Sequence, residues 1–242
     1  MKKRFFIGFV LLFVLLSALG LLLCSGRLWF NSPSLTEYPV RGIDVSHYQG
    51  TIDWQQIARQ DIRFAFIKAT EGSSYQDSLF SENWSAAMQT DIRIGAYHFF
   101  SYDSPGLFQA KNFIQTVPKT DHMLPPVIDL EFYGKYRSEP LPKADVCAIL
   151  DSLLAALEQH YQMKPILYVT PDIYEMYIRG GYCAYPIWLR SVYEKAALPD
   201  NREWTFWQYS HRGSLKGYDG PETYIDLNVF NGTEEEFAHF PS

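Results

Sequence analysis

Apolar residues are arranged in two different ways along the chain. One unbroken apolar run covers residues 5–23 and carries no charged side chain. From residue 41 onwards, short apolar runs alternate with segments in which apolar residues recur every three or four positions. The first pattern is typical of a membrane or signal segment, and the second of alternating β-strands and α-helices.

The alternating region predicts eight strands and several helices. The clearest helix covers residues 144–160, where five apolar side chains form one stripe: Val146, Leu150, Leu153, Leu154 and Leu157. The other helices are predicted over 52–60, 79–89, 105–117 and a short segment from Pro171. The strands are predicted over 42–45, 64–68, 92–100, 126–130, 165–169, 185–189, 205–209 and 224–229. Residues 192–204 are too irregular for a helix.

This order of elements predicts an α/β fold with a parallel sheet. Eight strand units in about 200 residues favour an irregular, incomplete (β/α) barrel of the TIM-like type. The first and last strands are neighbours in a closed barrel, so we expect the segments around Asp44 and Asp226 to lie side by side.

The N-terminal run follows Lys2, Lys3 and Arg4. As a helix, 19 residues extend about 28 Å, close to the hydrocarbon thickness of a bilayer. We therefore expect a signal-anchor or transmembrane segment over 1–26, with the basic cluster in the cytoplasm and the remaining chain outside. Cleavage near Ala18 to Gly20, which would give a secreted protein, is the alternative. Residues 27–40 read as a linker, and residues 41–242 as one domain in the cell envelope.

Charge and cysteine content limit the partners. The chain of 242 residues has a net charge of -6, and its first 26 residues hold three basic and no acidic groups. The remainder is therefore more acidic, which excludes a nucleic-acid-binding surface as the main function. Cys147 and Cys183 could pair outside the cytoplasm or stay as core thiols. No cysteine and histidine spacing indicates zinc, and we expect no metal, no cofactor and a monomer.

Carboxylates stand at three predicted strand ends. Asp44 lies on the first strand, Asp129 and Glu131 close the fourth, and Asp226 lies on the last. In a β/α barrel these ends form one face, where catalytic groups gather. Asp129 and Glu131 are two residues apart and share a face, so one of them resists ionisation and becomes a general acid near neutral pH. Protonation of a glycosidic oxygen needs such a group. Hard-cation binding and helix capping or ion pairing are the alternatives.

Aromatic side chains accompany the same strand ends. Tyr97, Tyr168 and Trp188 are the three that we single out as sugar contacts, because aromatic faces stack on sugar C–H surfaces. His47, His98 and His211 are interpreted as hydrogen-bonded polar groups near the rim. Lys68 and Glu71 follow a strand, and we expect them to form an ion pair.

Eight segments in this order resemble glycoside hydrolase family 25, the Chalaropsis-type lysozymes. They cover nearly all of residues 41–232: RGIDVSHYQG (41–50), FAFIKATEG (64–72), GAYHF (95–99), PVIDLE (126–131), PILYV (165–169), PIWL (186–189), FWQYS (206–210) and IDLNVFNG (225–232). The resemblance implies an irregular β/α barrel. It also implies hydrolysis of the β-1,4 bond between N-acetylmuramic acid and N-acetylglucosamine in peptidoglycan.

The resemblance also implies roles for individual residues. Glu131 matches the general acid/base, and Asp129 matches the residue that orients the substrate's N-acetyl group. Asp44 and Asp226 match the other two acids of the pocket. Tyr97, Tyr168 and Trp188 match aromatic contacts to the sugar. Arg190 and Ser191, and also Phe100, depart from the pattern of many relatives and leave the subsites in doubt.

Mechanism and function each keep an alternative. We expect the substrate's acetamido group to attack the anomeric carbon, whereas inversion with Asp44 or Asp226 activating water is the competing route. A catalytically inactive, membrane-tethered peptidoglycan-binding domain and a chitin-type glycosidase are the alternatives to a muramidase.

Overall fold

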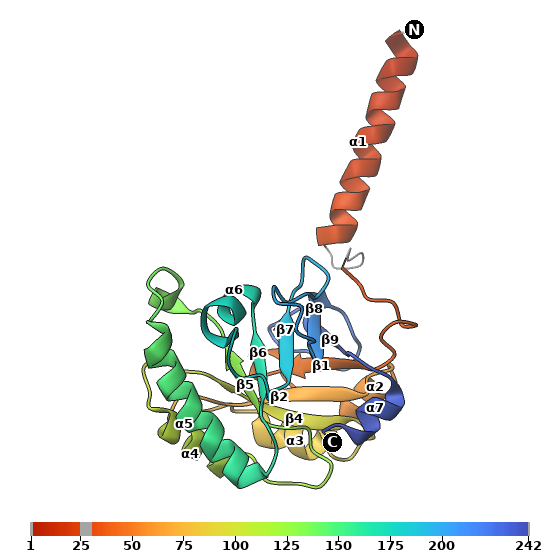
Figure 1. Ribbon diagram of the computed structural model, residues 1–242. Helices are drawn as coiled ribbons and strands as arrows, with labels where there is room; N and C mark the ends of the chain where they lie inside the picture. Colours follow the sequence, from red (N-terminus) through yellow and green to blue (C-terminus); the bar gives the residue numbers. More distant parts are fainter. Residues whose placement is uncertain (1, 25–30, 242) are drawn as a thin grey trace.

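A closed barrel of eight strands forms the body of the protein in the computed structural model, which describes residues 2–24 and 31–241 (Figure 1). The strand order is β1-β9-β8-β7-β6-β5-β4-β2, and pairing of β1 with β2 closes the ring. The strands are β1 (Arg41–Val45), β2 (Phe64–Glu71), β4 (Arg93–Phe99), β5 (Val127–Leu130), β6 (Ile166–Val169), β7 (Ile187–Arg190), β8 (Phe206–Gly213) and β9 (Ile225–Phe230). The short β3 (Tyr75–Gln76) pairs only with β2.

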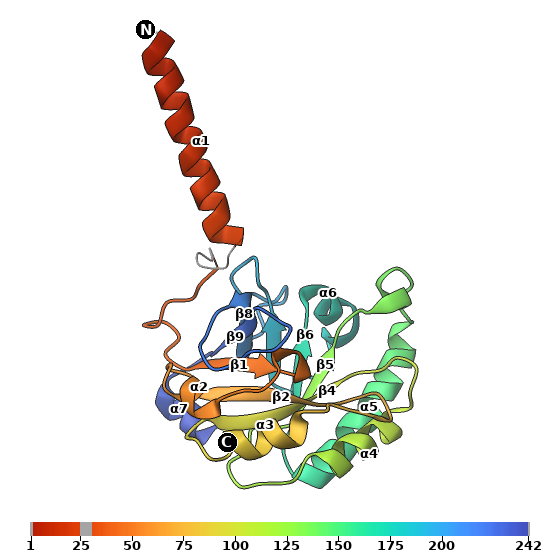
Figure 2. The same cartoon turned by 180° about the vertical axis from the view of Figure 1, so that it is seen from behind.

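The helical layer is incomplete, as predicted. Helices α4 (Gly106–Thr116) and α5 (Lys143–Tyr161) lie side by side on one flank in both views (Figure 2). The other helices are α2 (Trp54–Ala58), α3 (Phe80–Ala87), α6 (Pro171–Ile173) and α7 (Glu234–His239), and single turns occur at η1 (His47–Gln49), η2 (Gly134–Arg137) and η3 (Tyr174–Ile178). No helix connects β7 to β8 or β8 to β9.

The eight predicted strands are confirmed, but the prediction that all of them run parallel is wrong. Strand β9 runs antiparallel to both β8 and β1. The connection from β8 to β9 covers residues 214–224 and contains no helix. A parallel return needs a crossover of a dozen or more residues, usually helical, so this short connection brings β9 back in the opposite direction.

The sequence analysis also missed β3 and the C-terminal helix α7. Helix α7 begins with a capping box, in which the Thr233 hydroxyl accepts from the Glu236 backbone N–H and the Glu236 carboxylate accepts from the Thr233 backbone N–H. The spacing Thr-x-x-Glu was the available sequence signal. Phe237 of this helix packs against Phe64 inside the barrel, with ring centroids 5.6 Å apart. Helix α7 therefore closes the end of the barrel opposite the strand ends that carry the acids.

Two apolar clusters stabilise the barrel, one inside and one outside. Strand β2 shows the division, because Phe64 and Phe66 belong to the inner cluster whereas Ala65 and Ile67 belong to the outer cluster beneath the helices. This alternation follows from the two-residue period of a strand. Lys68 continues the inner face at the end of the strand and lines a cleft. The inner cluster thus forms a solid floor beneath polar side chains.

Two glycines make room for this floor. A Cβ atom on Gly42 would lie 2.3 Å from the Phe64 ring, and one on Gly95 would lie 2.8 Å from the Phe66 ring. Each glycine stands two residues before a cleft residue on the same strand face, namely Asp44 and Tyr97. The large phenylalanine rings therefore fill the lower barrel while the next inward positions remain open for polar groups.

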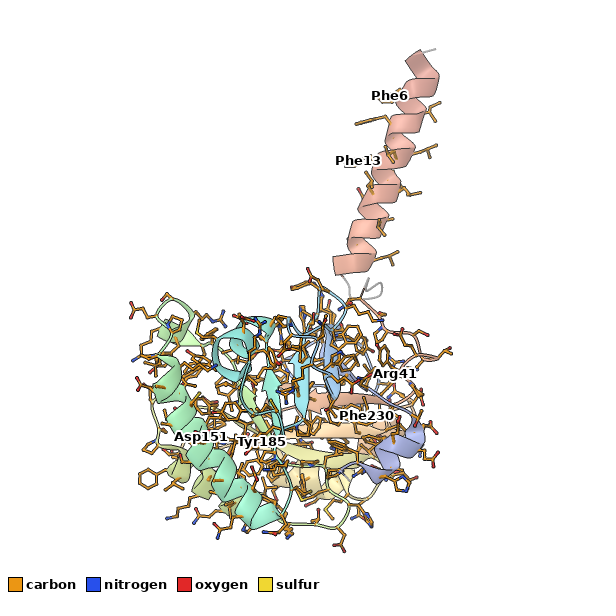
Figure 3. All side chains as sticks on the ribbon, in the orientation of Figure 1. Phe6, Phe13, Arg41, Asp151, Tyr185 and Phe230 are labelled. Carbon is orange, nitrogen blue, oxygen red and sulfur yellow. The ribbon has the colours of Figure 1, made fainter. Side chains whose placement is uncertain are left out.

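Helix α1 (Lys2–Cys24) stands apart from the barrel (Figure 3). Its large apolar side chains, such as Phe6 and Phe13, are exposed. The predicted N-terminal helix is confirmed. Within the residues that the structure describes, no helix is both long enough and apolar enough to cross a membrane. The prediction of a transmembrane anchor is corrected accordingly.

Part of the predicted linker lies against the domain. The Asn31 side-chain amide donates hydrogen bonds to the carbonyl oxygens of Ser191 and Glu194, at 2.8 and 2.9 Å. Tyr38 is buried and packs against Trp204. These contacts place the chain before β1 beside the segment that follows β7.

The two cysteines of the domain are separate free thiols. Cys147 lies near the carbonyl oxygen of Tyr177, and Cys183 lies near that of Gly181. The possible Cys147–Cys183 disulfide is therefore absent from the structure.

His98 is a residue of β4 with both ring nitrogens hydrogen-bonded, as predicted, but it is fully buried and does not line the cleft, so its predicted place near the rim is wrong. Its Nε2 lies 3.0 Å from Oε1 of Gln109, and its Nδ1 lies 2.7 Å from the hydroxyl of Thr70. The Gln109 amide nitrogen donates to Ser101 and Ser104 carbonyls, so its oxygen accepts from His98. Nε2 thus carries the proton of a neutral ring, and burial lowers the pKa of His98 to about 4.

This neutral histidine makes folding sensitive to acid. Because the unfolded ring has a pKa near 6.5, the unfolded chain binds more protons between pH 6.5 and 4, and stability is lost as the pH falls through that range. From pH 7 to pH 5 the His98 contribution should shrink by about 2 kcal/mol. Urea unfolding of wild type and His98→Gln at both pH values measures the change in their difference. The exposed His160→Gln is the matched control; a pH-independent difference for His98→Gln would refute this account.

Candidate active site

A cleft of about 740 Å³ opens at the end of the barrel where the parallel strands end and the antiparallel strand β9 begins. Residues from all eight barrel strands contribute to its wall. The lining includes all four predicted acids and all three predicted aromatic residues: Asp44, Asp129, Glu131, Asp226, Tyr97, Tyr168 and Trp188. The structure thus brings together in one cleft all seven residues that the sequence predicted as catalytic or sugar-binding.

The four acids occupy two sides of this cleft. Asp44 on β1 and Asp226 on β9 are register partners, as expected for neighbouring first and last strands. Asp129 lies on β5 and Glu131 directly follows the end of that strand, so both come from the opposite part of the ring. Asp44 and Asp129 are 8% and 9% exposed, whereas the Glu131 side chain is 31% exposed. Glu131 is therefore the more accessible member of its pair.

A network of side-chain amides surrounds Asp44. The indole N–H of Trp188 can only donate, and it donates to the Asn228 side-chain oxygen at 2.8 Å. Asn228 must therefore direct its NH₂ group to Asp44, at 2.6 Å. The Tyr168 hydroxyl donates to the Gln208 side-chain oxygen at 3.0 Å, and the Gln208 NH₂ group donates to both Asp44 oxygens at 3.0 and 3.2 Å.

This network fixes Asp44 as an acceptor of hydrogen bonds. Burial raises the pKa of Asp44, but hydrogen bonds from Asn228 and Gln208 oppose that rise. Burial and the neighbouring Asp44 charge raise the pKa of Asp226 well above its usual range, and a hydrogen bond joins the two carboxyl groups. The pKa of Asp226 is thus raised more than that of Asp44, so Asp226 is the member of the pair that holds a proton more readily and donates the hydrogen bond between them.

Asp129 and Glu131 form the second acid pair. Burial raises the pKa of Asp129 well above its usual range, and the nearby Glu131 charge adds to the rise. Burial also raises the pKa of Glu131, against the effect of the Arg190 guanidinium. Among the described residues, Oδ1 of Asp129 is buried and has no hydrogen-bond partner. An unsatisfied buried oxygen of this kind is unfavourable until a ligand supplies a donor.

Arg190 at the end of β7 is a cation whose charge acts on both acid pairs. Its Nε lies 4.0 Å from Oε1 of Glu131. Its charge lowers the pKa of Glu131, and it has the same effect on Asp44, Asp129 and Asp226. A second cleft cation, Lys68, is paired with Glu71 at 3.0 Å, which confirms the predicted ion pair. Arg190 and Lys68 thus both oppose the rise in the pKa of Asp129.

The three predicted aromatic contacts differ in how much surface they offer. Trp188 is only 2% exposed and Tyr168 only 6%, and the polar atoms of both hold the amides around Asp44. Tyr97 is half-buried and lines the cleft. Stacking on a sugar stays a prediction for all three, with Tyr97 the most accessible. Holding Gln208 and Asn228 in place is an observed role for the other two.

Sequence reasoning missed Gln208 and Asn228 as members of the site. Both are buried polar side chains on strands, and Asn228 stands two residues after Asp226 on the same face. An amide at an inward position of an apolar strand was the available signal, because a buried amide must find hydrogen-bond partners. Among the described residues, no group of three or more histidine, cysteine or acidic side chains is placed to hold a metal ion.

Of the other two histidines, His47 is partly exposed, and its Nδ1 lies 2.7 Å from the buried Asp77 carboxylate. His47 is therefore a bonded rim residue, as predicted. His211 lines the cleft and packs edge-on against Tyr193, with ring centroids 5.9 Å apart.

Known proteins similar to this chain include several glycosyl hydrolases of one family. The model of glycosyl hydrolases family 25 matches residues 43–218. The uncharacterized protein YegX of Escherichia coli K12 is 38% identical over 208 residues, covering 84% of this chain and 74% of YegX. Lysozyme M1 of Streptomyces globisporus is 32% identical over 210 residues, covering 80% of this chain and 68% of the lysozyme. A family 25 glycosyl hydrolase structure from Bacillus anthracis superimposes with a TM-score of 0.83 at 50% identity, covering 87% and 97%.

Proposed function

The chain belongs to glycosyl hydrolases family 25, and on this premise we propose that it is a muramidase. The bond cleaved is the β-1,4 linkage between N-acetylmuramic acid and N-acetylglucosamine of peptidoglycan. The observation that carries this proposal is the pair of Asp129 and Glu131 in a cleft that Asp44 and Asp226 also line. Relatives named lysozyme or N,O-diacetylmuramidase support the same substrate.

Glu131 is the proposed general acid/base. A general acid must reach the leaving oxygen and must hold a proton near neutral pH. The Glu131 side chain is partly exposed to the cleft, and its partial burial raises its pKa. These two properties support protonation of the glycosidic oxygen by Glu131 and later activation of water by the same residue.

Asp129 is the proposed partner of the substrate's acetamido group. Its buried Oδ1 lacks a donor among the described residues, and an acetamide N–H is a donor of suitable size. A hydrogen bond to the ionised form lowers the pKa of a carboxyl group. Substrate binding would therefore leave Asp129 ionised, and repulsion by its negative charge would favour the protonated form of Glu131. With Asp129 ionised and Glu131 protonated, the acetamide oxygen can attack the anomeric carbon while Glu131 protonates the leaving oxygen. The Asp129 carboxylate then stabilises the positively charged oxazolinium-like intermediate.

The Asp44–Asp226 pair supports this assisted route over inversion. A carboxylate has about four acceptor positions, and Asp44 uses them for Gln208, Asn228 and Asp226. Asp226 holds a proton more readily than Asp44, so neither residue is well suited to deprotonate water. We assign to them a supporting role, in which they fix the charge and shape of the cleft beneath the sugar.

The stereochemistry of the product tests the mechanism. The assisted route passes through two displacements and retains the β-configuration, whereas direct attack by water inverts it. We expect proton NMR of a fresh digest to show the β-anomer first, followed by mutarotation. Initial formation of the α-anomer would overturn the assisted route but leave the muramidase assignment intact.

Parallel digestion of two polymers tests the function. The purified full chain should release soluble fragments from peptidoglycan and leave chitin oligosaccharides intact. Preferential cleavage of chitin would establish the chitin-type alternative. Binding of peptidoglycan without any cleavage would establish the inactive binding domain. Because peptidoglycan lies outside the cytoplasm, we also propose that the domain acts in the cell envelope.

A further inference from the structure

Two arginines flank the proposed general acid in the cleft. Arg190 ends β7, with Nε 4.0 Å from Glu131, and its side chain is 33% exposed. Arg137 lies in the η2 turn, lines the same cleft and is exposed. The charges of both arginines act on Glu131. Both arginines therefore line the cleft that holds Glu131.

The N–H groups of both guanidinium groups remain available to a ligand. Apart from the 4.0 Å approach to Glu131, no hydrogen bond or ion pair is made by either guanidinium to the described residues. Each guanidinium carries five N–H donors in a planar fork that matches a carboxylate. Lys68 differs because it is paired with Glu71 and lies over the rings of Tyr75 and Phe99. The free cationic donors of the cleft thus belong to the arginines.

The remaining charges of the cleft would repel an anionic ligand. Six carboxyl groups line it, against the three cations discussed: Asp44, Asp129, Glu131, Asp172, Glu222 and Asp226. A carboxylate can therefore be accommodated only where a guanidinium faces it. The glycan of the proposed function carries such a group, because each muramic acid has a lactyl carboxyl two ring carbons from the reacting C1.

We propose that Arg190, assisted by Arg137, binds the free lactyl carboxylate of the muramic acid at the cleavage site. This inference rests on the proposed function and specifies its substrate as glycan strands without stem peptides. An attached stem peptide converts the lactyl carboxyl into a neutral amide, which removes the charge that the guanidinium recognises. The reaction class that supplies this substrate is hydrolysis of the amide bond between the lactyl group and the stem peptide.

Matched substrates isolate the carboxylate. The purified full chain is assayed on peptide-free strands, on the same strands with each lactyl carboxyl converted to a neutral methylamide, and on peptide-bearing strands. A charge-assisted hydrogen bond changes kcat/KM by about 10- to 100-fold, so wild type should prefer the free acid by that factor. In Arg190→Gln this preference should fall to near one. Arg190→Lys should keep part of it, because a lysine retains the charge but not the fork.

The ratio between substrates separates recognition from structural damage. A purely structural role of Arg190 would lower both rates in parallel and leave their ratio unchanged, which would overturn the inference. Arg59→Gln, an exposed arginine outside the cleft lining, is the matched control and should keep the wild-type ratio. Equal cleavage of acid and methylamide by wild type would also overturn it. Preference for peptide-bearing strands would assign the arginines to a stem-peptide carboxylate instead. Failure to cleave any strand would refute the proposed function itself.

Discussion

Replacing Glu131 by glutamine should lower kcat on peptidoglycan by about 100- to 10,000-fold, the usual contribution of a positioned general acid. Glutamine has nearly the same shape but cannot give a proton to the leaving oxygen. Burial already raises the pKa of Glu131, so removal of its charge should not reduce folding stability. Initial rates of reducing-end release, with thermal unfolding on the same samples, measure both effects.

The exposed Glu139→Gln is the matched control for this change, since it lies outside the cleft lining. It should retain the wild-type rate and melting temperature. Retention of more than about a tenth of the activity by Glu131→Gln would remove this residue from the role of general acid.

Replacing Asp129 by asparagine should lower kcat by about 100- to 1,000-fold, comparable with the loss of one electrostatic group from a preorganised site. Asparagine can still accept a hydrogen bond from the acetamide, but it cannot offset the positive charge of the intermediate. The loss should therefore appear mainly in kcat, with KM changed less. Steady-state kinetics on soluble glycan fragments separate the two constants.

The same change should stabilise the fold as the pH rises. The folded-state pKa of Asp129 lies well above its ordinary value of 3.8 because of burial and Glu131. The folded protein thus keeps a proton that the unfolded chain releases above pH 3.8, so wild type loses stability as the pH increases from that value. Asparagine removes this loss, and Asp129→Asn should be more stable than wild type at pH 7. The exposed Asp91→Asn should show neither effect; equal stability of Asp129→Asn and wild type at every pH would contradict the buried-acid account.

The sequence predicted the acids of the site well, because their positions follow from the two-residue period of strands and from the places where strands begin and end. Asp44, Asp129 and Asp226 stand at inward positions of β1, β5 and β9, and the pairing of Asp44 with Asp226 followed from barrel closure. These features depend on local geometry that residue order alone encodes.

Other features depend on contacts between distant segments. The direction of β9 follows from the length of its connection, and the partners of Gln208 and Asn228 come from β1, β6 and β7. The sequence predicts Trp188 as a sugar contact. The structure adds that this side chain is buried and that its N–H orients Asn228. Hydrogen-bond satisfaction across strands decided these roles, and a single strand's pattern does not contain that information.

The most direct test of the central claim identifies which sugar becomes the new reducing end. Peptidoglycan is digested with the full chain or with Glu131→Gln, reduced with labelled borohydride and hydrolysed to its sugars. Cleavage after muramic acid predicts labelled muramitol from wild type and only background label from the variant. Labelled glucosaminitol from wild type, or equal muramitol labelling from both proteins, would contradict the account.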